Sequence, residues 1–272
     1  MPAMLFDRTT LPYSLISSFA ELPIPFRCVG TDMVTGASVE LKDGSLPRAL
    51  RASMSVPGVF APVEIDGRIL SDGGLVNNIP TNIVKDMGAD ILLVVNIETQ
   101  LGNRESLDNL LGILAQTINI ASADNSRRSL RQAELIIAPE LGELSSTDFS
   151  KAAEIIELGY RGAQQKAEIL KGLSLNEADW QSHLANRRAR KLTEDPPTPK
   201  YLAVDGDNKK SVEAIDEKLG DKYVGQPLDK DRQDQLSKDL SELVGTGRFA
   251  SLEFELQKKK NETGLKIITN EP

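Results

Sequence analysis

The sequence predicts a mixed α/β protein with a smaller second domain of α+β class. Through residues 1–174, short apolar segments alternate with segments of helical periodicity, which is the order of a layered α/β fold. Three prolines in the seven residues 193–199 then indicate a stiff, extended spacer. We therefore expect one domain at 1–174, a helix and proline-rich linker at 175–199, and a second domain at 200–272.

The elements of the first domain follow from periodicity and turn signals. In chain order, the expected elements are strands at 26–32, 37–41, 63–65, 68–70, 91–97 and 135–138, and helices at 46–53, 78–87, 106–120 and 148–170. Asp66-Gly67 predicts a tight hairpin because both residues tolerate positive φ. The run 91–97 is apolar and β-branched, as expected for a parallel strand covered on both faces. Ser106 and Asp148 are expected to cap the helices that follow them.

The second domain follows the order strand, helix, helix, strand, strand. Its expected elements are a strand at 201–204, helices starting at Ser211 and at Asp229 or Asp231, and strands at 249–256 and 265–268. In the strand 249–256, alternation predicts Leu252, Phe254 and Leu256 on the buried face. The same alternation predicts that Glu253 and Glu255 face outward. This order is typical of a compact two-layer α+β domain.

Composition excludes several classes of function. The chain has 32 basic and 40 acidic side chains and a net charge of −8, which argues against a nucleic-acid partner. A single cysteine, Cys28, excludes an internal disulfide and a multi-thiolate metal site, and it is expected to be a small core residue. A single histidine, His183, excludes a histidine metal cluster and is expected at the surface. The first residues lack the pattern of a signal peptide.

The segment Ser71-Asp72-Gly73-Gly74 follows the predicted hairpin directly and is the candidate site. Gly73 and Gly74 tolerate positive φ and close approach of another segment. An aspartate in this position can be held within hydrogen-bond reach of a partner, as a general base must be. The tetrapeptide by itself is equally typical of a plain Asp-Gly turn, which is commoner in proteins.

The longer segment 45–80 resembles the patatin-like phospholipase family. The resemblance rests on Ala52-Ser-Met-Ser-Val-Pro-Gly-Val-Phe-Ala-Pro-Val63, on Asp72-Gly-Gly-Leu75 and on Asn77-Asn-Ile-Pro80, and it extends over about residues 15–170. It implies a layered α/β hydrolase domain, a lipid ester substrate at a membrane surface and a serine–aspartate dyad without histidine. Within that dyad it implies that Asp72 is the base, in a motif with Gly73 and Gly74. No cofactor is implied, since an activated hydroxyl needs none.

The chain departs from this family at the nucleophile. The G-x-S-x-G motif is absent from the sequence, because Glu40 and Asn176 follow its two partial matches. The resemblance implies that the serine and a glycine-rich oxyanion loop precede the first residues here. We therefore expect an N-terminally truncated domain that does not hydrolyse esters as given. Ser53 and Ser55 are expected to be turn and packing residues.

Residues 200–270 resemble a POTRA domain through the segments 204–211, 223–229 and 239–249. This resemblance implies a bacterial protein of the cell envelope, either periplasmic and outer-membrane or secreted. It also implies polypeptide or β-barrel partners, because a strand edge in such modules can pair with extended segments. A barrel is expected to follow Pro272.

Two functions remain open from the sequence. The first is a patatin-like lipid acyl hydrolase, and the alternative is an inactive scaffold or periplasmic assembly module acting through the POTRA-like domain. The basic run 187–191 has two interpretations as well. It either contacts anionic lipid headgroups or forms a solvated helix end near the negative end of the macrodipole, and the second is favoured.

Overall fold

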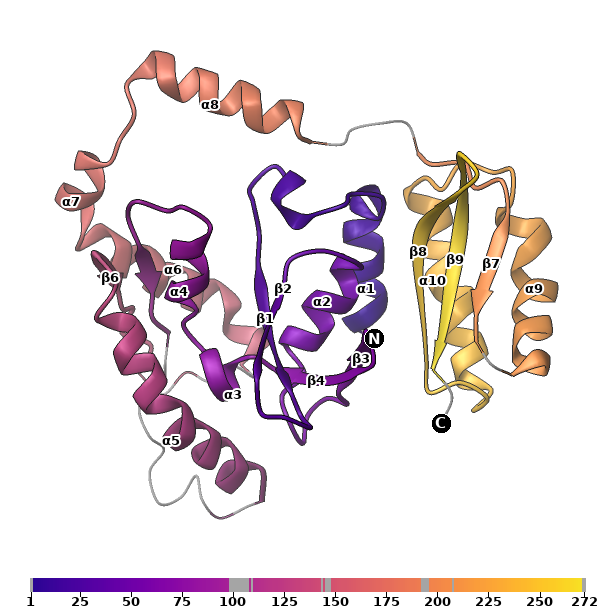
Figure 1. Cartoon of the computed structure of the whole chain (residues 1–272), viewed down its shortest axis with the longest axis horizontal. Coiled ribbons are helices and arrows are strands. Elements are labelled where there is room, and N and C mark those ends of the chain that lie inside the picture. Colours follow the sequence, from indigo (N-terminus) through magenta and orange to yellow (C-terminus); the bar gives the residue numbers. More distant parts are fainter. Residues whose placement is uncertain are drawn as a thin grey trace. The chain divides into compact units, whose positions relative to one another are not determined.

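A computed structural model describes residues 2–97, 108, 110–142, 144, 148–191, 196–206 and 208–270 (Figure 1). The chain forms two compact units. The terminal unit contains Met1–Phe26, Lys42–Arg51 and Arg187–Pro272, and the site unit contains Arg27–Leu41 and Ala52–Asn186. The mixed α/β class is confirmed. The expected domain limits at 174 and 200 stay a prediction.

The terminal unit contains a three-stranded sheet in the order β7-β9-β8 (Figure 1). Strand β7 (Leu202–Asp205) pairs in parallel with β9 (Glu262–Asn270), which pairs antiparallel with β8 (Ser251–Lys259). Helices α9 (Lys209–Tyr223) and α10 (Lys230–Gly245) lie between β7 and β8 in the chain. The predicted order of strand, helix, helix, strand, strand is therefore confirmed.

The caps of these two helices differ in how well the sequence predicted them. Asp229 accepts a hydrogen bond from the backbone N–H of Arg232 at 2.9 Å and caps α10 as expected. The expected start of α9 at Ser211 is wrong, because Asn208 caps it and accepts from the N–H of Lys210 at 3.1 Å. Asparagine is as good an N-cap as serine, and it comes first in the chain.

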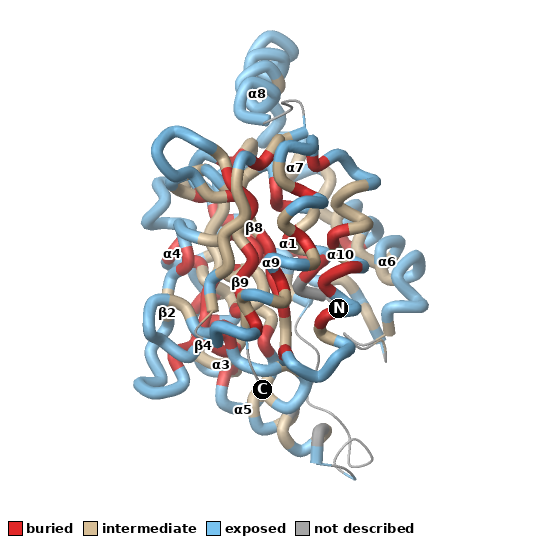
Figure 2. The backbone as a smooth tube through the Cα atoms, turned by 90° about the vertical axis from the view of Figure 1, so that its right-hand side faces the viewer, coloured by how far each residue is buried: buried red, intermediate tan, exposed pale blue. Residues whose placement is uncertain are grey.

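The hydrophobic core of the terminal unit joins its sheet to three helices. Leu236, Leu240 and Leu265 have no exposed surface, and red segments follow β8, β9 and α10 in Figure 2. Helix α1 (Pro2–Thr10) adds Met4 to the same cluster. The expected outward position of Glu253 is wrong: it is 7% exposed and its carboxylate lies 3.5 Å from the guanidinium of Arg48.

The site unit contains an antiparallel sheet in the order β2-β1-β4-β3. Its strands are β1 (Cys28–Asp32), β2 (Ser38–Leu41), β3 (Val63–Ile65) and β4 (Arg68–Asp72). The predicted hairpin between β3 and β4 is confirmed, since Asp66 and Gly67 have φ values of 51° and 72°. Positive φ at both central residues matches the twist of the two strands.

A parallel pair, β5 (Leu93–Val95) and β6 (Leu135–Ile137), forms the second sheet of the site unit. The expected burial of β5 on both faces is wrong. Val94 is buried, whereas Leu93 and Val95 are 43% and 56% exposed. The side chains alternate across the strand, so one face of β5 is covered and the other is open among the described residues.

The helices of the first 189 residues follow the predictions in part. They are α2 (Leu46–Ser53), α3 (Gly74–Asn77), α4 (Thr81–Asp86), α5 (Leu110–Leu130), α6 (Ala152–Gln164), α7 (Ala167–Gly172) and α8 (Glu177–Ala189). The expected single helix at 148–170 is wrong, because Lys166 leaves the helical region with φ −106° and ψ 11°. The side chain of Asp148 makes no capping bond. The expected cap Ser106 lies outside the described residues.

Short 3-10 turns complete the described secondary structure at Leu11–Tyr13, Phe19–Glu21 and Phe149–Lys151. The second of them has a full capping box, in which Ser18 accepts from the N–H of Ala20 at 3.2 Å and Glu21 accepts from the N–H of Ser18 at 2.9 Å. Within the described ranges, no helix combines the length and apolar character that a bilayer crossing requires.

Candidate functional site

Asp72 is the last residue of β4, and two hydrogen bonds hold its backbone. Its N–H donates to the carbonyl of Ser55 at 3.1 Å, and its carbonyl accepts from the hydroxyl of Thr31 at 2.7 Å. Asp72 also pairs with Gly30 across β1. Because both neighbouring segments bond to the Asp72 backbone, the sheet fixes the direction of its Cα–Cβ bond.

The Asp72 carboxylate turns back onto the glycine two residues later. The N–H of Gly74 donates to Asp72 Oδ1 at 2.7 Å. Burial raises the pKa of this carboxyl above its ordinary value, although the Gly74 hydrogen bond lowers it in part. A carboxylate with a raised pKa is a stronger base, which suits proton transfer from a hydroxyl group. Oδ1 is the oxygen of this carboxylate that the turn at Gly74 holds in place.

The two glycines after Asp72 are needed because there is little room for a side chain, and not because of their backbone conformation. Gly73 has φ −66°, and neither glycine has the positive φ that the sequence allowed. A Cβ on Gly73 would lie 2.3 Å from the carbonyl oxygen of Val29, so another side chain cannot fit without moving β1. A Cβ on Gly74 would lie 2.9 Å from Asp72 Oδ1, which is the end of a side chain that can rotate.

The serines nearest to Asp72 have structural roles, as expected. Ser55 has no exposed surface, and its carbonyl accepts from the hydroxyl of Ser71 at 2.6 Å as well as from Asp72. Ser53 hydrogen-bonds to Cys28, whose pKa burial raises to about 12. A thiol with that pKa stays protonated at neutral pH and is a poor nucleophile.

A second carboxylate, Asp32, stands at the end of β1 beside β4. Its Oδ1 accepts from the backbone N–H of Val34 at 2.9 Å and of Thr35 at 3.4 Å. These hydrogen bonds hold the pKa of Asp32 below its ordinary value. Asp32 therefore stays ionised and closes the turn to β2, whereas the environment of Asp72 favours protonation.

Sequence reasoning found Asp72 but missed the residues that hold it. Thr31 and the carbonyl of Ser55 come from segments 17 or more residues away in the chain, and no local pattern marks a threonine or a backbone carbonyl as a partner. The signal that was available is indirect: Ser55 lies in a segment that carries the family resemblance, and Thr31 lies in the range 15–170 over which the resemblance extends.

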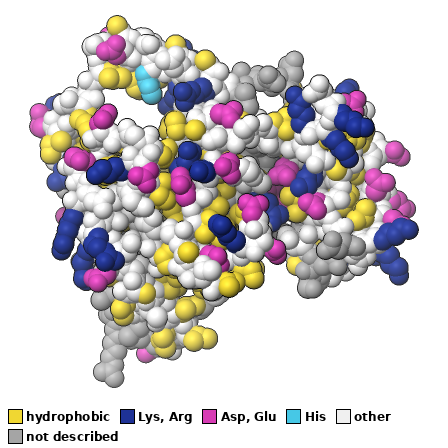
Figure 3. Space-filling view, viewed as in Figure 1, with side chains coloured by type: hydrophobic (Ala, Val, Ile, Leu, Met, Phe, Trp, Pro, Cys, Tyr) yellow, Lys and Arg dark blue, Asp and Glu magenta, His cyan; other side chains and the backbone are white. Residues whose placement is uncertain are grey.

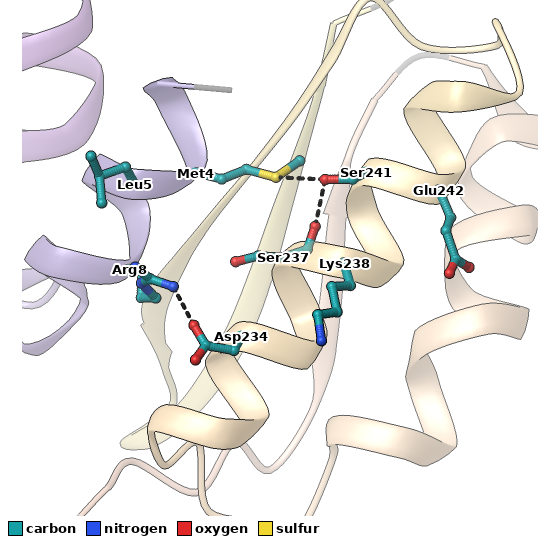
Figure 4. A pocket seen from close by; sticks show the side chains of 8 residues that line it. All are labelled: Met4, Leu5, Arg8, Asp234, Ser237, Lys238, Ser241 and Glu242. Carbon is teal, nitrogen blue, oxygen red and sulfur yellow. Dashed lines mark hydrogen bonds and ion pairs between the residues drawn. The ribbon is translucent and has the colours of Figure 1, made fainter. Parts of the chain in front are cut away.

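Two surface hollows lie elsewhere in the described structure. One, of about 650 Å³, lies between α1 and α10 of the terminal unit (Figure 4). Its charges are engaged, since Arg8 pairs with Asp234, and the Ser241 hydroxyl lies 3.4 Å from the sulfur of Met4. The other, of about 420 Å³, is lined by Leu173, Ser174, Leu175, Trp180 and His183. Neither hollow includes Asp72.

Among the described residues, no three histidine, cysteine or acidic side chains gather closely enough to hold a metal ion. His183 lies on α8 and stacks on Trp180, with the ring centroids 5.5 Å apart and an angle of 17° between the rings. Its expected surface position is confirmed by its exposure.

Comparison with known proteins finds similarity in this region to one family. Residues 18–85 match the model of the patatin-like phospholipase family. The chain is 43% identical over 77 residues to an uncharacterized NTE family protein of Mycobacterium tuberculosis, which is 28% of this chain and 21% of that protein. It is 30% identical over 176 residues to patatin-like phospholipase domain-containing protein 7 of Mus musculus, which is 55% of this chain and 13% of that protein.

A second uncharacterized NTE family protein of Mycobacterium tuberculosis is 29% identical over 168 residues, covering 53% of this chain and 29% of that protein. The chain thus spans less than a third of the length of each of these three relatives. The matches support a patatin-like phospholipase domain of NTE type, and Asp72, Gly73 and Gly74 all fall inside the matched residues.

Proposed function

We propose that this chain carries the general-base half of a lipid acyl hydrolase, with Asp72 as the base of a serine–aspartate dyad. The observation that carries the proposal is the Asp72 carboxylate, held by the Gly74 N–H at 2.7 Å in a partly desolvated position with a raised pKa. The match of residues 18–85 to the patatin-like phospholipase family supports it independently.

The reaction follows from the chemistry of that carboxylate. Asp72 removes the proton of a serine hydroxyl as the serine oxygen attacks the carbonyl carbon of a lipid ester. Backbone N–H groups stabilise the oxyanion of the tetrahedral intermediate. When the intermediate collapses, the protonated Asp72 returns its proton to the leaving alcohol. The acyl group is then bound to the serine oxygen. Asp72 removes a proton from a water molecule as the water attacks this ester, and the proton returns to the serine oxygen when the fatty acid is released.

The nucleophile has to come from outside the sequence given, since no serine here stands in G-x-S-x-G. We propose that this chain alone does not hydrolyse esters. The environment of Asp72 agrees with a dyad that needs no imidazole. A base is most effective when its pKa lies near the working pH, and burial raises the pKa of Asp72 in that direction.

The test is an Asp72→Asn substitution in a protein that contains this segment together with a G-x-S-x-G serine. We expect hydrolysis of a soluble short-chain ester to fall by about 10²–10⁴-fold, the usual contribution of a general base. Asp66→Asn is the matched control, because Asp66 is an exposed turn residue where asparagine also accepts positive φ. Unchanged hydrolysis in the folded Asp72→Asn protein contradicts the proposal.

A second candidate function belongs to the terminal unit. Its sheet order β7-β9-β8 and its sequence of elements support a POTRA-like module of the cell envelope that binds polypeptides or a β-barrel. In this unit Asp7 occupies the outer edge of β8 by accepting from the Phe254 N–H at 3.2 Å, so β7 is the edge that an extended segment would join. A protein that carries the serine yet lacks all ester hydrolysis favours this candidate over the first.

A further inference from the structure

Helix α8 differs from the other long helices because none of its residues is buried. Every described side chain in it is exposed except Leu184, which is intermediate. A helix of 13 residues gains most of its stability from packing, and α8 packs no face into a core. Its side chains are therefore available to another surface.

One face of α8 carries its large apolar side chains. Trp180, Leu184 and Arg187 follow one face at helical spacing, and Trp180 is 43% exposed while it stacks on His183. Leu173 and Leu175, which are 43% and 54% exposed, line the hollow below that stacked pair. Together they form a small apolar patch with polar ring nitrogens.

The charged side chains of α8 are divided between its two ends. Glu177 and Asp179 lie in the first turn, where Asp179 is tied to Asn176 by hydrogen bonds of 2.7 and 2.9 Å and Glu177 to Gln181 at 2.8 Å. The basic side chains Arg187, Arg188, Arg190 and Lys191 follow from the last turn. Among the described residues they make no ion pair. Figure 3 shows basic side chains gathered along α8 beside the single histidine.

We infer that α8 and the Leu173–Leu175 turn form a docking surface for the headgroup layer of an anionic bilayer. Tryptophan and leucine side chains favour the boundary between headgroups and acyl chains, and basic side chains favour anionic headgroups. An exposed helix with both kinds of side chain is better suited to contact with a lipid surface than to full exposure to water. The inference deepens the proposed function, on which it rests, because a lipid acyl hydrolase must meet its substrate at a bilayer.

The charge of the whole chain makes this inference easy to refute. A net charge of −8 repels an anionic bilayer, so attraction can come only from a local cluster of basic side chains. Each basic side chain near such a surface contributes about fivefold to partitioning. Loss of three of them should therefore weaken binding by about a hundredfold.

The test uses Trp180, which is the one tryptophan in the sequence, as its reporter. The chain is titrated with vesicles of phosphatidylcholine alone or mixed with phosphatidylglycerol, and tryptophan emission and co-sedimentation are measured. We expect a blue shift and sedimentation with the mixed vesicles only. Both should decline when salt rises from 0.1 to 1 M, because the Debye length falls from about 10 to about 3 Å.

The decisive variant replaces Arg187, Arg188 and Arg190 with glutamine. Its control replaces the exposed Lys258, Lys259 and Lys260 with glutamine, which changes the net charge equally at another surface. Binding that falls about a hundredfold in the arginine variant alone supports the docking surface. Absence of wild-type binding, or equal loss in both variants, overturns it. No ester is hydrolysed in this assay, so its outcome is independent of the Asp72→Asn experiment.

Discussion

Residues 196–270 of the terminal unit and the site unit bury their apolar side chains to very different extents. In the described residues of 196–270, no large hydrophobic side chain is exposed, and Leu240 and Leu265 have no exposed surface at all. In the site unit, Val95, Phe149 and Ile156 are 56%, 83% and 72% exposed. Apolar burial is the main stabilising contribution to a fold, so residues 196–270 are expected to contribute more stability per residue than the site unit.

The candidate site nevertheless lies in a well-buried part of the site unit. Leu70 and Ser55 have no exposed surface, and Val29 is 4% exposed. These residues come from the strands and the segment that hold Asp72. The Asp72 carboxylate is thus held in place by a small group of buried residues and by backbone hydrogen bonds, and not by a large apolar core.

The largest effect is expected from one substitution made in both units. Leu240→Ala removes a side chain with no exposed surface and should lower the free energy of unfolding by about 2–5 kcal/mol. Leu93→Ala removes a side chain that is 43% exposed and should cost less than about 1 kcal/mol. Urea unfolding of both variants measures the difference. Equal losses would show that the exposed face of β5 is covered in solution.

A smaller effect is expected where the site depends on close packing. Gly73→Ala places a Cβ against the Val29 carbonyl and should destabilise the site unit by about 1–3 kcal/mol, the usual cost of overpacking. Gly74→Ala meets only the ends of the Asp72 and Asn78 side chains, which can rotate, and should be tolerated better. Thermal unfolding compares the two variants. A Gly74→Ala protein less stable than Gly73→Ala contradicts this view of the motif.

The smallest effect, taken over a single pH unit, is a pH dependence in the terminal unit. Burial raises the pKa of Asp7 from 3.8 to about 8, with the nearby charges of Glu253 and Glu255 adding to the increase, while Arg48 and the Phe254 N–H oppose it. Between about pH 4 and pH 8, Asp7 therefore keeps its proton in the folded state and has lost it in the unfolded state. The contribution of Asp7 to the free energy of unfolding is therefore fully present below about pH 4. It declines as the pH rises to about 8, by at most about 1.4 kcal/mol per pH unit.

Asp7→Asn tests this dependence, since asparagine keeps the acceptor for the Phe254 N–H and carries no charge. We expect its unfolding free energy at pH 6 and pH 7 to differ less than that of the wild type. Asp231→Asn, at an exposed position of α10, is the control and should keep the wild-type slope. Parallel slopes in wild type and Asp7→Asn would show that Asp7 is ionised in the folded protein.

Local chemistry explains the predictions that succeeded. Asp66-Gly67 defined its hairpin, and Asp229 defined the start of α10, because each depends on a few consecutive residues. Residues 45–80 carried enough of the family pattern to identify Asp72 as the candidate base. Alternation failed at Glu253 because an arginine from α2, about 200 positions earlier, covers it.

By itself, the sequence determined the order of the elements in residues 200–270, the turn chemistry and the position of Asp72 beside two glycines. These features follow from φ preferences and periodicity within a few residues. Only the tertiary structure decided that Gly73 is required by the Val29 carbonyl, that Asp72 is bound by Thr31 and Ser55, and that α8 packs into no core. Contacts between distant segments set burial, and burial sets both the pKa of a carboxylate and the exposure of a helix.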